Sequence, residues 1–94
     1  MKHKTVLIIA TLDTKAEEAL FLKELIEAKG VRTLVMDIGI TGKSTFRPDF
    51  PSHEIAGVVS RTLPELLSFH DESKAMAEMA RGAFSFYWAT NILL

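Results

Sequence analysis

The sequence contains no cysteine, which excludes disulfides, thiolate metal sites and cysteine nucleophiles. Its three histidines, His3, His53 and His70, have no ligand-like spacing, so we expect no metal site. A net charge of −1 gives no basic footprint for nucleic acid. No stretch approaches the roughly 20 apolar residues of a membrane span, and the apolar run at residues 6–10 is too short for a signal peptide. We therefore expect no nucleic acid or membrane partner and a cytoplasmic location.

The chain has 94 residues, of which 48% are hydrophobic and 24% charged. This balance is ordinary for a globular protein. The length permits one small domain with a modest core.

Residues 4–17 are predicted to organise the domain as a strand, a loop and the start of a helix. Residues 5–11 (TVLIIAT) form a near-continuous aliphatic and β-branched run, which is typical of a strand covered on both faces. A helix is expected to begin at Thr14, whose hydroxyl fits a capping box with Glu17. Its broad apolar face comprises Ala16, Ala19, Leu20, Leu22, Leu25 and Ile26.

The helix is expected to run to Lys29 and to stop at Gly30, before a second strand at residues 31–38. A strand, a helix and a strand form a βαβ unit with parallel strands. A loop over residues 39–51 and two or three helices follow. Their expected caps are Ser52, the pair Thr62 and Glu65, and Asp71. The predicted fold class is α/β, a partial Rossmann-like three-layer fold.

The best candidate site is the loop that contains Thr11, Leu12, Asp13, Thr14 and Lys15. Free N–H groups at the helix start, two hydroxyls and one lysine converge where a phosphate or carboxylate could bind. Ligands of open α/β sheets sit at such strand-to-helix turns. The alternative is structural: Thr14 caps the helix, Asp13 offsets its dipole and Lys15 is solvated.

Asp37, near the carboxyl end of the second strand, has two interpretations. In dinucleotide-binding folds a carboxylate at this point accepts a hydrogen bond from a ribose hydroxyl. In the structural interpretation, the carboxylate tethers a loop. Residues 37–44 also come within one residue of a Walker A loop, but Asp37 replaces its first glycine and prolines follow. We therefore predict no P-loop. Gly39 and Gly42 either shape a loop beside a ligand or make turns.

The last residues, 84–94, are strongly apolar and hold four of the eight aromatic side chains. We interpret them as core or interface, which suggests an incomplete domain or one that needs a partner.

Residues 4–27 (KTVLIIATLDTKAEEALFLKELIE) and 35–50 (VMDIGITGKSTFRPDF) resemble the tobamovirus-multiplication (Tm)-like ATP-binding domain family. The resemblance covers residues 4–83, and residues 84–94 depart from it. It implies that residues 1–94 are the N-terminal part of a nucleotide-binding α/β domain that binds ATP, with Mg²⁺ as a candidate companion ion, and forms dimers. The nucleotide-side positions that it implies are Thr11, Asp13, Thr14, Lys15, Asp37 and Gly39.

We therefore predict an apparently truncated ATP- or nucleotide-binding domain, with phosphate near the Thr11–Lys15 loop and ribose near Asp37. Its expected partners are the nucleotide and either further copies of the chain or a missing C-terminal half. One alternative is a protein-interaction or dimerisation module that uses the apolar C-terminal helix. Another is a gene fragment without independent function. No catalytic constellation is evident, so ATP hydrolysis is not expected.

Overall fold

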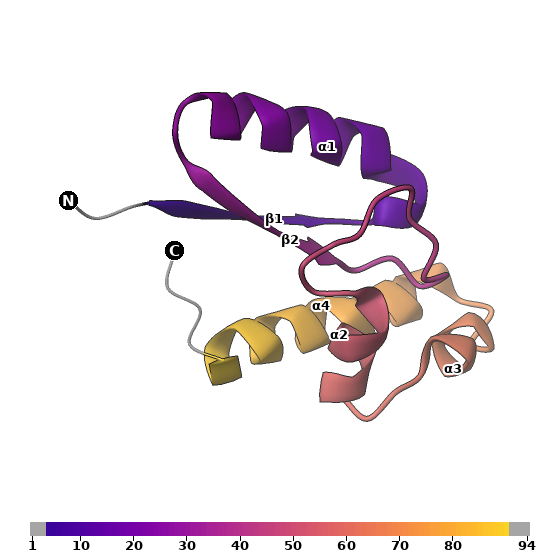
Figure 1. The fold of residues 1–94 in the computed structure, drawn as a ribbon. Coiled ribbons are helices and arrows are strands. Elements are labelled where there is room, and N and C mark those ends of the chain that lie inside the picture. The colour runs from indigo at the N-terminus through magenta and orange to yellow at the C-terminus, as the bar shows by residue number, and fades with distance from the viewer. Residues whose placement is uncertain (1–3, 91–94) are drawn as a thin grey trace.

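The structure is a computed structural model that describes residues 4–90. Its elements follow in the order β1 (Thr5–Ala10), α1 (Leu12–Ala28), β2 (Arg32–Asp37), α2 (Ser52–Val58), α3 (Leu63–Leu67) and α4 (Glu72–Thr90). The two strands form the middle layer, with α1 over one face and α2 and α4 over the other (Figure 1). This arrangement confirms the predicted α/β fold with one βαβ unit.

The two strands pair in parallel, from Thr5 opposite Arg32 to Ala10 opposite Asp37. Both therefore end at the same edge of the sheet. The loops that leave those ends, residues 11–15 and 38–45, are brought together as the sequence predicts for a βαβ unit.

The far side of β2 is also occupied, by an extended segment of the long loop. The N–H of Asp37 donates to the carbonyl of Phe50 at 2.9 Å, and the N–H of Phe50 donates to the carbonyl of Val35 at 3.0 Å. The carboxylate of Asp49 accepts from the N–H of Val35 at 2.7 Å. β2 is thus flanked on both sides, whereas β1 pairs only with β2 among the described residues.

One hydrophobic cluster lies on each face of the sheet. The cluster beneath α1 consists of Ile8, Leu12, Ala16, Ala19 and Val35. The cluster beneath α2 and α4 consists of Met36, Ile55, Ala56, Leu66, Ala75, Met79 and Ala83. Small side chains let α2 and α4 approach closely, because a Cβ atom added at Gly82 would lie 2.5 Å from the carbonyl oxygen of Ile55.

The start of α1 differs from the sequence prediction. The helix begins at Leu12, and its N-cap is Thr11. The Thr14 hydroxyl bonds back to the Thr11 carbonyl at 3.4 Å, so the predicted capping box with Glu17 is wrong. Leu12 is pulled into the first turn because its side chain packs in the core and its N–H is held by Asp37. A backbone kink at Lys15 (φ −124°, ψ 23°) then joins this turn to the rest of the helix.

Other helix ends follow the sequence more closely. Thr62 and Glu65 form the predicted capping box of α3. Asp71 accepts from the N–H of Lys74 at 3.1 Å, as expected of a cap before α4, and Gly30 adopts a φ of +79° after α1. Ser52 is not a cap, because α2 begins there after Pro51 and buries the side chain.

Several apolar side chains predicted to be buried remain at the surface. Of the predicted face of α1, Ala16 and Ala19 are buried, whereas Leu20, Leu22 and Leu25 are exposed. Near the C-terminus, Phe86 packs against the core and Phe50, but Phe84 and Trp88 are 68% and 75% exposed. Residues 91–94 lie outside the described residues. Within the described range, no helix combines the length and hydrophobicity needed to cross a bilayer.

Candidate functional site

The candidate site is the edge at which both strands end, where the 11–15 turn meets the loop after β2. The carboxylate of Asp13 joins them. Its Oδ2 accepts from the hydroxyl of Thr41 at 3.0 Å and lies 3.4 Å from the Thr41 backbone nitrogen. The two loops therefore form one polar surface above the strand ends.

Asp37 is the buried charged group of this edge, with 3% of its surface exposed. Its Oδ1 accepts two backbone hydrogen bonds, from Leu12 at 3.1 Å and from Gly39 at 2.8 Å. Its Oδ2 accepts none from the described residues. No fully buried side-chain polar atom of these residues lacks a partner, so Oδ2 is not completely enclosed, although the whole residue is only 3% exposed. One oxygen thus fixes the loops, and the other accepts no hydrogen bond from the described residues.

Burial raises the pKa of the Asp37 carboxyl above its usual range, since desolvation disfavours the charged form. The two backbone N–H groups oppose this shift, and the nearby charge of Asp13 adds to it. Ionisation of Asp37 is therefore costly to the fold.

This pKa shift predicts how stability depends on pH. A folded pKa above the unfolded value means that the contribution of Asp37 to stability is present at low pH and is lost as pH rises through the folded pKa. Asp37→Asn keeps an acceptor oxygen but removes the charge. We expect the variant to match the parent near pH 3 and to gain free energy of unfolding relative to it as pH rises above about 4. Urea denaturation at several pH values measures this difference, and a parent that gains stability relative to Asp37→Asn as pH rises would contradict the assignment.

Gly39 has a steric role beside Asp13. A Cβ atom at Gly39 would lie 2.7 Å from Oδ1 of Asp13, closer than such contacts allow. The glycine therefore leaves space for the carboxylate that binds Thr41.

The other predicted site residues are brought together but serve different parts of the structure. Leu12 is 1% exposed and belongs to the core, so only its backbone lies at the site. Its N–H is taken by Asp37 and is not free for a phosphate. The hydroxyls of Thr11 and Thr14 lie 3.1 Å apart at the surface, and Lys15 is exposed with Glu18 at 3.5 Å. The contacts of Asp37 are those of a carboxylate that tethers a loop, and Lys15 is solvated, which are the two structural interpretations given above. Nucleotide binding by the seven candidate residues stays a prediction.

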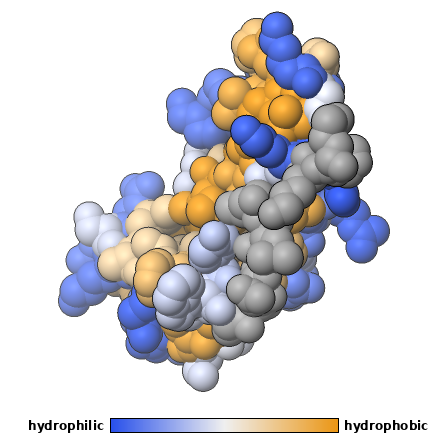
Figure 2. All heavy atoms as spheres, turned by 90° about the vertical axis from the view of Figure 1, so that its left-hand side faces the viewer, coloured by the Kyte–Doolittle hydropathy of each residue, from blue (hydrophilic) through white to orange (hydrophobic). Residues whose placement is uncertain are grey.

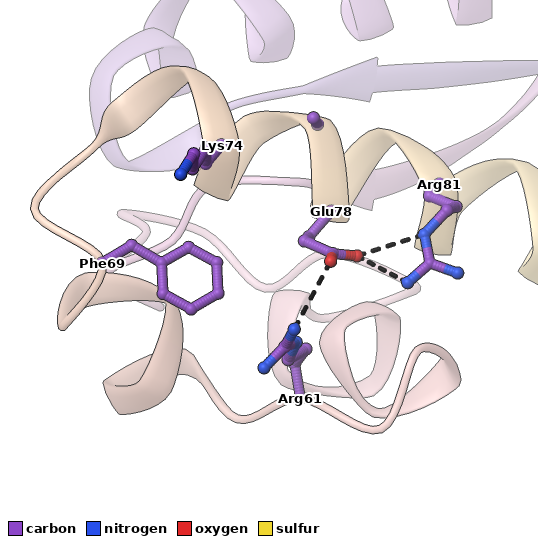
Figure 3. A pocket seen from close by; sticks show the side chains of 6 residues that line it. Arg61, Phe69, Lys74, Glu78 and Arg81 are labelled. Carbon is purple, nitrogen blue, oxygen red and sulfur yellow. Dashed lines mark hydrogen bonds and ion pairs between the residues drawn. The ribbon is translucent and has the colours of Figure 1, made fainter.

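A second polar hollow, of about 510 Å³, lies beside α4 and shares no residue with the strand ends. Figure 3 shows Arg61 and Arg81 both directed at Glu78, at 3.6 Å and 2.7 Å. Arg61 also pairs with Glu65 at 3.0 Å and lies over the Phe69 ring. Both arginines are engaged with carboxylates, so this network ties α4 to the segment before α3. The spacings of Arg61 with Glu65 and of Glu78 with Arg81 were readable in the sequence, but the link between Arg61 and Glu78 required the fold.

No group of three histidine, aspartate or glutamate side chains able to hold a metal ion occurs within residues 4–90.

The family profile and the similar proteins that match this chain all point to the same family. The profile described as the uncharacterised protein family (UPF0261) N-terminal domain matches residues 4–91. A UPF0261 protein of Clostridium tetani is 37% identical over 81 residues, which are 86% of this chain and 20% of that protein. A UPF0261 protein of Brucella suis is 36% identical over 78 residues, 83% of this chain and 19% of that protein. No solved structure matches the chain.

These matches correct the family resemblance drawn from the sequence. The similarity is to UPF0261 proteins and not to the tobamovirus-multiplication-like ATP-binding family. Short motifs such as the one at residues 11–18 misled the assignment, because they carry less information than a match over nearly the whole chain. The chain spans about a fifth of the length of the curated relatives it matches.

Proposed function

This chain belongs to the UPF0261 family, and we propose that the carboxyl edge of its sheet forms one wall of a nucleotide-binding site. ATP is the probe ligand that we favour. The ribose lies at Asp37 and the phosphates at the exposed ends of the two loops. The chain corresponds to about a fifth of its relatives, so this wall binds weakly by itself.

The observation that carries the proposal is the second carboxylate oxygen of Asp37, Oδ2, which has no hydrogen-bond partner among the described residues. A buried carboxylate is costly unless its oxygens find partners. Here two backbone N–H groups hold Oδ1 and orient the side chain, which leaves Oδ2 as an acceptor that is not completely enclosed. In dinucleotide-binding folds an acidic residue after the second strand binds a ribose hydroxyl. Asp37 occupies the corresponding place, since it is the last residue of β2.

The phosphate side is supplied by exposed donors near the same edge. The Thr14 hydroxyl and the ammonium of Lys15 lie on the 11–15 turn, and Lys43 lies on the facing loop with its side chain exposed. Asp13 and Asp37 both carry negative charge close to the start of α1. The phosphates therefore contact the lysines rather than the first N–H groups of the helix, which differs from the cradle expected from the sequence.

Calorimetry with two ligands and three variants separates the two halves of this site. Asp37→Asn is expected to weaken adenosine binding roughly tenfold, because a hydrogen bond to a charged acceptor is lost. Lys15→Ala should weaken ATP about fivefold and leave adenosine unchanged, because only ATP carries the phosphates that the ammonium binds. Lys29→Ala, at the opposite end of α1, is the matched control and should change neither affinity.

Circular dichroism confirms that each variant is folded before titration. If millimolar adenosine and ATP give no heat with the parent chain, or if Lys29→Ala weakens ATP as much as Lys15→Ala, the proposed site is wrong.

A further inference from the structure

The free edge of β1 carries the features of a strand that is built to have a second neighbour. Its residues, TVLIIA, include no charge, proline or bulge, the devices with which natural edge strands avoid pairing. Such near-continuous apolar strands occur in parallel sheets whose two faces are both covered. β2 has a neighbour on each side and buries its last three residues, whereas β1 leaves Ile9 49% exposed.

Unpaired backbone groups line this edge. The carbonyls of Lys4 and Ala10 accept from Arg32 and Ile38, at 3.2 Å and 2.9 Å, and so point toward β2. Backbone groups of a strand alternate between its two edges. The N–H and C=O groups of Thr5, Leu7 and Ile9 therefore point away from β2, where no described strand pairs with them.

Apolar hollows lie on both faces of the sheet beside the same edge. On the α4 side, a hollow of about 440 Å³ is almost entirely apolar. Its walls include Leu7, Ile9, Ala83, Phe84 and Tyr87. On the α1 side, a hollow of about 410 Å³ is lined by residues that include Ile9, Ala19 and Leu22. Ile9 borders both hollows.

The helices above and below these hollows expose apolar side chains that residues 4–90 leave uncovered. Leu22 on α1 and Phe84 on α4 are exposed, and Phe84 stacks on Trp88 with ring centroids 6.1 Å apart. Figure 2 looks onto the end of the molecule where β1 begins and shows apolar side chains gathered between the level of α1 and that of β1. A strand beside β1 would bury its two side-chain faces under both helices.

We infer that the β1 edge is the docking site for a parallel, apolar strand supplied by the part of the UPF0261 chain that lies beyond this N-terminal segment. The relatives keep about four-fifths of their length outside the matched region, so such a segment exists in the family. A second copy of this chain fits less well, because two-fold symmetry would pair the two β1 edges in antiparallel. The occupant is thus the family's own continuation, and the present chain forms one edge of a larger sheet.

A chimera tests this inference. Residues 4–90 of this chain replace the matching segment of the Clostridium tetani relative, and hydrogen exchange is followed in the chimera and in the 94-residue chain. The amides of Leu7 and Ile9 are expected to gain protection of at least ~100-fold in the chimera. The amides of Val6 and Ile8, which point toward β2, serve as internal references.

One substitution, made in both contexts, tests the side-chain contacts. Ile9→Lys should leave the urea midpoint of the 94-residue chain nearly unchanged and lower that of the chimera clearly, because only the chimera buries this side chain. Leu25→Lys is the matched control, since Leu25 is also 49% exposed but borders neither hollow.

The inference is overturned if Leu7 and Ile9 exchange equally fast in both proteins, or if Ile9→Lys acts alike in both. It is also overturned if the chimera does not fold although the 94-residue chain does. Self-association of the 94-residue chain with protected Leu7 and Ile9 amides would assign the edge to a second copy instead.

Discussion

Gly82→Ala is expected to lower the free energy of unfolding by about 1–3 kcal/mol, the usual cost of forcing extra atoms into a packed contact. The added Cβ would lie 2.5 Å from the backbone carbonyl of Ile55, which cannot rotate away as a side chain could. Helix α4 must therefore move from α2, and the cluster around Ile55 and Met79 loosens with it.

Gly57→Ala is the matched control, because the same change in α2 meets no atom within 4 Å. It should stabilise the domain by about 0.5–1 kcal/mol, since alanine favours a helix over glycine. Urea denaturation followed by circular dichroism compares the two variants. Equal effects of the two substitutions would show that α2 and α4 do not approach as closely as described.

Leu12→Ala is expected to destabilise the domain by about 2–5 kcal/mol, because it removes a fully buried side chain and leaves a cavity under α1. Leu12 is 1% exposed and packs with Ile8, Ala16 and Val35. The substitution keeps the N–H that donates to Asp37, so the loss reports packing and not the hydrogen bond.

Leu25→Ala serves as the reference in the same helix. Its side chain is largely solvated, so the expected change is within about 0.5 kcal/mol. Thermal or urea unfolding of both variants gives the comparison. A Leu12→Ala variant as stable as Leu25→Ala would show that the Leu12 side chain is not buried in the core.

Features set by neighbouring residues were predictable from the sequence. The apolar runs marked β1 and β2, Gly30 marked the end of α1, and Thr62 with Glu65 marked the start of α3. Each of these carries a signal in a short stretch of sequence, which local patterns describe directly.

Features set by distant contacts were not predictable. Helix α1 begins two residues before the predicted start at Thr14, where the N–H of Leu12 donates to the carboxylate of Asp37, 25 positions away in the sequence. The flank of β2 is built by Phe50 from a segment that reads as loop. The sequence located Asp37 at the strand end, but only the fold shows that one of its oxygens is tied to two backbone N–H groups and that the other has no partner among the described residues.

The family resemblance drawn from the sequence was wrong because it depended on local motifs. The motif at residues 11–18 and the loop after β2 suggested a nucleotide site, and the same residues lie together at one edge of the sheet. These local residues placed the candidate site at one edge of the sheet but did not identify the family, whereas the UPF0261 match rests on residues 4–91.

Amide chemical-shift mapping during an ATP titration of the 94-residue chain is the most direct test of the proposed site. The account predicts shifts that cluster at residues 13–15 and 37–43, which include Asp37 and the exposed lysines. The amides of Arg61, Lys74 and Arg81, which line the ion-paired hollow beside α4, should not move. Shifts confined to that hollow, or no shifts at millimolar ATP, would contradict a nucleotide site at the carboxyl edge of the sheet.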